Sequence, residues 1–204
     1  MKPRIILAST SRYRRDLLSR LGFPFETASP NTDEQPLAGE SPRQLVSRLA
    51  EAKARAVASD YPDALIIGSD QVAVLDGDIL GKPGNPETNI HQLSRAAGRQ
   101  VTFLTGLCLL DSGTGQAEVD VVPFSVVFRK LTPAQIQNYV RREKPFDCAG
   151  GFKSEHLGIT LFQRMEGEDP TALVGLPLIR LVSMLGRQGF DVLGSSISRH
   201  GNNS

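Results

Sequence analysis

Hydroxyl and guanidinium side chains gather where a short apolar segment, residues 5–8, gives way to a helical pattern. The group consists of Ser9, Thr10, Ser11, Arg12, Arg14 and Arg15. A helix N-terminus presents unpaired N–H groups, and guanidinium forks fit phosphate oxygens. Arginines in a first helical turn oppose the helix dipole unless an anion is bound there. The pattern favours a phosphate-binding turn over the alternative, a capped surface helix.

A lysine interrupts the apolar face of the helix predicted over residues 41–59. At about 100° per residue, Lys53 falls near the middle of one apolar arc. That arc contains Leu45, Val46, Leu49, Ala50, Ala52, Ala56 and Val57. A lysine in this place must extend its stem to solvent, pair with a carboxylate or bind a ligand. We expect a functional lysine rather than one that only reaches solvent.

An aspartate lies inside the apolar, β-branched strand predicted over residues 65–74. Aspartate is depleted in strands, and Ile66, Ile67 and residues 72–74 flank Asp70 with a pattern typical of burial on both faces. A buried carboxylate needs a lysine or a divalent cation. The alternative is an edge or bulge position that faces solvent.

Two loops supply further charges that suit the same chemistry. Asp33 and Glu34 lie in a polar loop, and Lys82 lies in the Gly- and Pro-rich segment 81–86. With Lys53 and Asp70 they provide what hydrolysis of a phosphoanhydride requires. A divalent metal, Mg²⁺ or Mn²⁺ on Asp70 and Glu34, would hold phosphate oxygens, lysines would neutralise developing charge, and a carboxylate would accept a proton from water.

A small-residue segment, 148–155, ends in Phe152-Lys153-Ser154-Glu155. Small residues allow the backbone to approach a ligand closely. Glu155 is a candidate acceptor for hydrogen bonds from the edge of a nucleobase. The alternative is an ordinary glycine-rich loop before a strand.

Composition narrows the class of protein. The chain has 204 residues, of which 40% are hydrophobic, and this fits one domain over residues 1–193 followed by a disordered tail, 194–204. The net charge of +1 argues against nucleic-acid binding. Only two cysteines occur, Cys108 and Cys148, and they suggest buried free thiols rather than a disulfide or zinc site. No apolar segment has the length of a signal peptide or a membrane span, so we expect a cytoplasmic protein.

Strand and helix patterns alternate, which indicates an α/β fold. Strands are predicted at 4–8, 23–28, 65–74, 79–80, 101–110, 118–129 and 158–163, and helices at 14–21, 41–59, 87–97, 132–142 and 177–187. The two long segments 101–110 and 118–129 are joined by a Gly-Thr-Gly tip and form an antiparallel hairpin. The sheet, flanked by helices, is therefore mixed.

These residues, in this order, make the chain similar to the Maf family of nucleotide pyrophosphatases. The segments that carry the resemblance are 7–15, Asp33-Glu34, Ala52-Lys53, Gly68-Ser69-Asp70-Gln71, Gly81-Lys82-Pro83 and Val174-Gly175-Leu176-Pro177. The resemblance implies a fold like that of inosine-triphosphate pyrophosphatases, commonly dimeric. It also implies hydrolysis of a nucleoside triphosphate to the monophosphate and pyrophosphate with a divalent cation.

The resemblance assigns roles to particular residues. Asp70 matches the family's proton acceptor, Ser9 and Arg14 match its phosphate-binding turn, and Glu34, Lys53 and Lys82 match its charged cleft. Substrate choice maps onto Tyr13, Gln71 and Glu155.

The Phe152–Glu155 segment and Tyr13 resemble the branch of the family that acts on 7-methyl-GTP. Methylated guanine is cationic, so an aromatic face at Tyr13 or Phe152 and a carboxylate at Glu155 suit it. Two alternatives remain: the dTTP/UTP branch of the same family, and a nucleotide-binding regulator of cell division that does not catalyse. The regulator would need the cations, whereas a buried carboxylate repels phosphates unless a metal intervenes.

Overall fold

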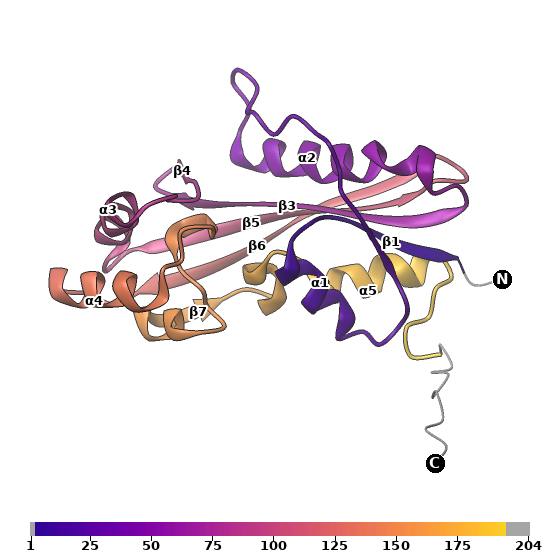
Figure 1. The fold of residues 1–204 in the computed structure, drawn as a ribbon. Helices are drawn as coiled ribbons and strands as arrows, with labels where there is room; N and C mark the ends of the chain where they lie inside the picture. The colour runs from indigo at the N-terminus through magenta and orange to yellow at the C-terminus, as the bar shows by residue number, and fades with distance from the viewer. Residues whose placement is uncertain (1–2, 195–204) are drawn as a thin grey trace, which may run out of the picture.

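A computed structural model describes residues 3–194 and contains a mixed seven-stranded sheet covered by helices (Figure 1). The strands are β1 (Arg4–Ala8), β2 (Glu26–Ala28), β3 (Ala64–Leu75), β4 (Asp78–Leu80), β5 (Gln100–Asp111), β6 (Ala117–Phe128) and β7 (Phe162–Glu166). The α-helices are α1 (Arg12–Ser19), α2 (Pro42–Ala56), α3 (Pro86–Ala96), α4 (Pro133–Glu143) and α5 (Leu178–Arg187). Short 3₁₀ helices are η1 (Ala58–Asp60), η2 (Ala149–Gly151), η3 (Leu157–Leu161) and η4 (Pro170–Val174).

The sheet runs in the order β2-β1-β3-β5-β6-β7, with β4 paired to β3. β1 is parallel to β2 and β3, whereas β5 is antiparallel to β3 and to β6. The predicted α/β class, the mixed sheet and the β5–β6 hairpin are therefore confirmed. In the described part of the chain, no helix has the length and apolar character needed to cross a membrane.

The long strands β3, β5 and β6 extend through the whole molecule and join its two ends. Figure 1 shows α2 on one face of the sheet, α1 and α5 on the opposite face, and α3 and α4 grouped with β4 and β7 at the far end of the long strands. Asp70 is located at the middle of β3. It therefore lies between the end of the molecule that contains β1 and α1 and the end that contains α3 and α4.

Two glycines allow α2 to lie directly on the sheet. A Cβ at Gly68 in β3 would lie 2.0 Å from the carbonyl oxygen of Ala50, and one at Gly106 in β5 would lie 2.1 Å from that of Val46. Any side chain at either position would push the helix away. This close approach carries the C-terminal half of α2, including Lys53, down to the strand that contains Asp70.

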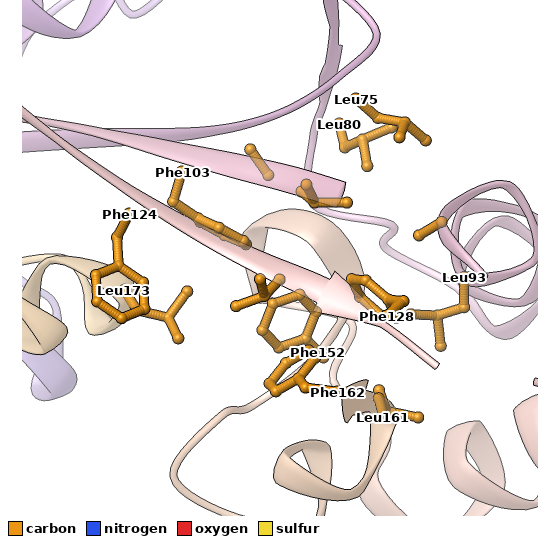
Figure 2. Packing of buried hydrophobic residues seen from close by; sticks show 14 of the residues in the cluster. Leu75, Leu80, Leu93, Phe103, Phe124, Phe128, Phe152, Leu161, Phe162 and Leu173 are labelled. Atoms are coloured by element: carbon orange, nitrogen blue, oxygen red, sulfur yellow. The ribbon is translucent and has the colours of Figure 1, made fainter. Parts of the chain in front are cut away.

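A cluster of phenylalanines fills the far end of the core (Figure 2). The Phe152 ring makes edge-to-face contacts with Phe103, Phe128 and Phe162 at centroid distances of 5.3, 5.6 and 4.9 Å. It is only 5% exposed. Phe152 is therefore a core residue that also lines the cleft described below, as does Tyr13, so stacking on a base by either ring stays a prediction.

The strand predicted over residues 158–163 is largely wrong. Leu157–Leu161 form η3, and β7 begins only at Phe162. The N–H of Gly158 bonds to the carbonyl of Lys153, and a Cβ on Gly158 would lie 2.3 Å from that oxygen. This tight turn prevents an extended backbone.

Three other predicted elements differ from the observed ones by more than one residue at an end, and the predicted tail cannot be compared. The strand predicted over 23–28 contains only Glu26–Ala28, the helix predicted over 14–21 begins at Arg12, and the helix predicted over 41–59 ends at Ala56, with η1 following. Residues 195–204 of the predicted tail lie outside the described part of the chain.

Candidate active site

A cleft of about 630 Å³ is lined by nine of the side chains predicted to form a site. They are Ser9, Tyr13, Arg14, Glu34, Lys53, Asp70, Gln71, Lys82 and Glu155. They come from the β1–α1 turn, the first turn of α1, the loop before α2, α2 itself, β3, the loop after β4 and the segment before η3. Segments more than 140 residues apart in the sequence therefore meet in one cleft.

Lys53 bridges two carboxylates at the base of this cleft. Its Nζ lies 2.7 Å from Oδ1 of Asp70 and 2.7 Å from Oε1 of Glu34. Lys53 and Asp70 are 5% and 8% exposed, whereas the Glu34 side chain is 60% exposed. Lys53 lowers the pKa of Glu34 by a hydrogen bond, and Lys82 and Arg14 lower it further through their charges. Lys53 thus joins a buried carboxylate, Asp70, to an exposed one, Glu34.

The helical face that carries Lys53 differs slightly from the predicted arc. Within the helix its buried members are Leu45, Val46, Leu49, Ala50, Lys53 and Ala54. Ala52 is half-buried and Ala56 is exposed. The predicted apolar arc therefore wrongly included these two alanines. Its centre still passes through Lys53, because residues three and four apart share one face of a helix. Lys53 is thus buried on an apolar face and paired with carboxylates rather than extended to solvent, and its role in function stays a prediction.

The β1–α1 turn arranges hydroxyl and guanidinium groups at the wall of the cleft. The Oγ of Ser9 accepts a hydrogen bond from the N–H of Ser11, and the Ser11 hydroxyl caps α1 by accepting from the N–H of Arg14. A hydroxyl oxygen that accepts in this way can still donate its own proton to a ligand. The Nε of Arg14 donates to the carbonyl of Gly175 at 2.9 Å. Burial lowers the pKa of this guanidinium, and the charges of Asp70 and Glu34 partly offset the effect.

The other two arginines of the turn behave differently from Arg14. Arg15 does not line the cleft; its side chain is 60% exposed, and its nearest acid is Asp16 at 3.9 Å. Arg12 lines the cleft but lies over the ring of Tyr13, 4.8 Å from the centroid. One face of Tyr13 is thus covered, and a base stacking on this ring has to use the other face.

The carbonyl groups of η4 and the residue after it, Gly175, hold site side chains from three other elements. We call residues 170–175 the carbonyl turn. The oxygen of Ala172 accepts from Nε2 of Gln71 at 2.6 Å and from the hydroxyl of Thr105 at 2.9 Å. The oxygen of Gly175 accepts from Arg14 and from the hydroxyl of Ser69.

These contacts determine which way the amide of Gln71 faces. Its Nε2 is surrounded by three acceptors: the carbonyls of Ala172 and Leu173 and the hydroxyl oxygen of Thr105, whose proton is given to Ala172. The opposite amide orientation would place the Gln71 Oε1 against these carbonyl oxygens. Gln71 therefore directs its Nε2 at the carbonyls of Ala172 and Leu173 and leaves its Oε1 as an acceptor.

Sequence reasoning missed Thr105 and most of the carbonyl turn. A threonine in a strand is an ordinary strand former, and backbone carbonyls have no sequence signal of their own. Only the Val174-Gly175-Leu176-Pro177 segment was picked out in advance, and only through the family resemblance.

Acidic and thiol groups line another part of the cleft. Glu155 is exposed, and its Oε2 accepts from the Ser154 hydroxyl at 3.1 Å. Cys148 is half-buried, and burial, assisted by the charge of Asp147, raises its pKa to about 12. The thiol therefore stays protonated at neutral pH and is a poor nucleophile. Cys108 is buried, and both cysteines are free, as predicted.

A bidentate arginine secures the loop that presents Glu34. Arg48 of α2 donates from Nε and Nη2 to the two oxygens of Glu40 at 2.6 and 2.8 Å, and from Nη2 to the carbonyl of Gln35. The hydrogen bond from Arg48, followed by one from the N–H of Leu37, lowers the pKa of Glu40 to about 2. The same helix thus holds both ends of the loop, through Arg48 and Lys53.

Asp70 and Glu34 are a donor set suited to a divalent cation that also binds phosphate. Mg²⁺ takes one or two carboxylates and completes its shell with phosphate oxygens and water. Within the described residues, no group of three or more His, Cys, Asp and Glu side chains is arranged to hold a metal alone. The donor chemistry therefore fits a metal shared with a phosphate ligand rather than a closed structural site.

Comparisons with known proteins identify the family of the chain. A protein from Pseudomonas aeruginosa named 7-methyl-GTP pyrophosphatase is 58% identical to the chain over 190 residues, which cover 93% of this chain and 99% of that protein. Residues 4–188 match the family described as Maf-like protein. The match spans every site residue described above, and the chain belongs to the Maf family.

Proposed function

We propose that the protein hydrolyses 7-methyl-GTP to 7-methyl-GMP and pyrophosphate. The observation that carries the proposal is the buried Lys53–Asp70 pair, joined to Glu34, at the base of a cleft that Arg14 and Lys82 also line. The name and high identity of the Pseudomonas relative support the choice of substrate.

The phosphates are bound at the β1–α1 turn. Arg14 offers a partly buried guanidinium, Ser9 offers a hydroxyl, and the first turn of α1 offers unpaired N–H groups. Lys82, from the loop after β4, neutralises charge that develops on the leaving pyrophosphate.

Asp70 accepts the proton of the attacking water. Its carboxylate is held at 2.7 Å by Lys53, which restricts its rotation. A base that is already oriented loses little free energy to reorganisation when the reaction begins. Lys53 and Glu34 therefore act with Asp70 as one unit.

Mg²⁺ or Mn²⁺ would be held by Asp70 and Glu34 together with phosphate oxygens. When bound, it would polarise the phosphoanhydride and lower the pKa of a bound water. Without it, two carboxylates beside a polyphosphate would repel the substrate.

The nucleobase is recognised by Tyr13, Gln71 and Glu155. The free face of Tyr13 stacks on the purine, and a cationic 7-methylguanine adds attraction of about 1–2 kcal/mol when desolvated. Gln71 Oε1 and the Glu155 carboxylate are acceptors, which suits the N1–H and amino donors of guanine. We also propose that the protein acts as a homodimer in the cytoplasm.

The test is pyrophosphate release with Mg²⁺ or Mn²⁺ from 7-methyl-GTP, GTP, dTTP, UTP, ITP and ATP. A preference for 7-methyl-GTP supports the proposal, whereas a preference for dTTP or UTP contradicts the substrate. Binding of nucleotides without hydrolysis would favour the regulator.

Variants then separate the roles. Asp70→Asn should nearly abolish turnover while the protein stays folded. Arg14→Ala should raise KM, and Arg15→Ala, on the next residue but outside the cleft, is its matched control. Glu155→Gln should reduce the preference for the methylated base more than it reduces turnover; an equal loss on every nucleotide would contradict its role in base selection.

A further inference from the structure

Asp169 is a buried carboxylate at the end of the cleft wall that the proposed reaction does not use. It is 2% exposed. Its Oδ1 accepts from the N–H and hydroxyl of Thr171 at 3.0 and 2.6 Å, and its Oδ2 accepts from the N–H groups of Ile179 and Arg180 at 2.8 and 3.4 Å. All four bonds are made within twelve residues of the chain.

The carboxylate replaces a missing helix cap. The residue at the N-cap position of α5 is Pro177, which makes no side-chain capping bond. Asp169 satisfies two N–H groups of the first turn of α5 from outside the helix, where its negative charge is also favoured by the helix dipole. At the same time it caps η4 through Thr171.

Hydrogen bonds of Asp169 and Thr171 therefore fix both ends of the carbonyl turn. The hydroxyl of Thr171 donates to Asp169 and accepts from the N–H of Leu178 at 2.8 Å. Between these ends lie the carbonyls of Ala172 and Gly175, whose oxygens bond to side chains of the site. The segment has little freedom to shift without breaking bonds at Asp169.

We propose that Asp169 is a positioning residue that holds the carbonyl turn in register with Arg14 and Gln71. This inference rests on the proposed function, in which Arg14 binds phosphate and Gln71 reads the base. A site needs its groups within about 0.5 Å of the productive geometry. The bonds from Arg14 and Gln71 to the turn are 2.9 and 2.6 Å long, so a displaced turn moves both side chains.

The competing explanation is that Asp169 only stabilises α5. Both explanations predict a lower melting temperature for a variant, so melting alone does not separate them. Positioning also predicts changes in two quantities that do not depend on how much protein is folded: KM and the ratio of kcat/KM between 7-methyl-GTP and GTP. It further predicts that the Arg14 Nε–H exchanges faster than in a control variant of equally lowered stability.

Four variants provide the test. Asp169→Asn replaces one acceptor oxygen by a donor, and Thr171→Val removes the hydroxyl without changing the shape, which gives a second route if Asp169→Asn fails to fold. Thr171→Ser keeps the hydroxyl and should retain the wild-type behaviour. Ile136→Ala in α4 is the control for lost stability, because Ile136 is buried and does not line the cleft.

The expected result is a rise in KM of at least fivefold and a change in the nucleotide ratio of at least threefold for Asp169→Asn and Thr171→Val. Ile136→Ala, compared at an equal fall in melting temperature, should show neither. Unchanged KM and ratio in Asp169→Asn and Thr171→Val would overturn the inference.

The exchange measurement separates this inference from the proposed function. In NMR spectra, Arg14 Nε–H should exchange at least tenfold faster in Asp169→Asn and Thr171→Val than in wild type, Thr171→Ser or Ile136→Ala. If the wild type hydrolyses no nucleotide, the proposed function fails, while faster exchange still supports the positioning role. Exchange at the wild-type rate in both variants would overturn it.

Discussion

Removing Lys53 should destabilise the protein, and removing Asp70 as well should restore part of the loss. Lys53→Met preserves the length of the side chain and its fit to the apolar face of α2, but leaves Asp70 buried without its cation. Breaking a buried pair in this way costs about 3–5 kcal/mol. Glu34 adds little, because an exposed pair contributes about 0–1 kcal/mol and its side chain is 60% exposed.

Asp70→Asn should lower the free energy of unfolding by less than Lys53→Met does. Lys53 retains Glu34 at 2.7 Å in that variant, so only the charge-assisted hydrogen bond to Asp70 is lost, about 1–3 kcal/mol. In the double variant, neither position 53 nor position 70 carries a buried, unpaired charge. The double variant should therefore exceed Lys53→Met alone in unfolding free energy by at least about 2 kcal/mol.

The assay is equilibrium unfolding in urea, followed by circular dichroism, for the wild type and the three variants. Equal slopes of free energy against urea allow direct comparison. Because stability is measured rather than turnover, the result does not depend on the proposed reaction. If Asp70→Asn destabilised Lys53→Met further, or if Lys53→Met cost less than about 1 kcal/mol, the reasoning from burial would be refuted.

Three further predictions concern the parts that position the site. Gly106→Ala should lower the free energy of unfolding by about 1–3 kcal/mol or more, since its Cβ would lie 2.1 Å from a carbonyl oxygen of α2. Unfolding in urea measures this change, and an unchanged free energy would contradict the close contact between helix and sheet. Thr105→Val should cost about 1 kcal/mol and loosen Gln71, seen as a changed ratio of kcat/KM between 7-methyl-GTP and GTP that Thr105→Ser does not show. Arg48→Ala should raise the pKa of Glu40 from about 2 toward its ordinary value, as an NMR titration of the carboxyl carbon would report. Because the folded pKa is the lower one, the stabilisation by this pair is complete above the unfolded pKa of about 4.3 and is lost as the pH falls toward 2.

Most of the fold was predictable because it depends on local pattern. The β5–β6 hairpin follows from two long apolar segments around a glycine tip, and α2 and α4 both begin at the capping boxes that their sequences contain. The strand predicted over 158–163 failed because Leu157–Leu161 turn back onto the carbonyl of Lys153. That contact depends on neighbouring backbone, not on strand propensity.

The site was predictable to the extent that its residues conflict with their surroundings. Lys53 on an apolar face and Asp70 in a buried strand are each costly alone, and this cost is visible in the sequence. Arg15 was included wrongly, because the three arginines of the first turn look equivalent until the direction of each side chain is known. Phe152 packs among the core phenylalanines and also lines the cleft, and only the structure could show that it does both.

The sequence by itself determined that this protein has an α/β fold, a charged lysine and carboxylate in apolar elements, and a hydroxyl- and arginine-rich turn. Periodicity, capping and the cost of buried charge act over a few residues and can be deduced from the chain. Only the tertiary structure decided which groups meet. Lys53 reaches Asp70 because two glycines let α2 lie against the sheet, and Gln71 faces one way because carbonyls about a hundred residues later surround its amide nitrogen. Such contacts depend on the packing of distant backbone, for which no residue type is a signal.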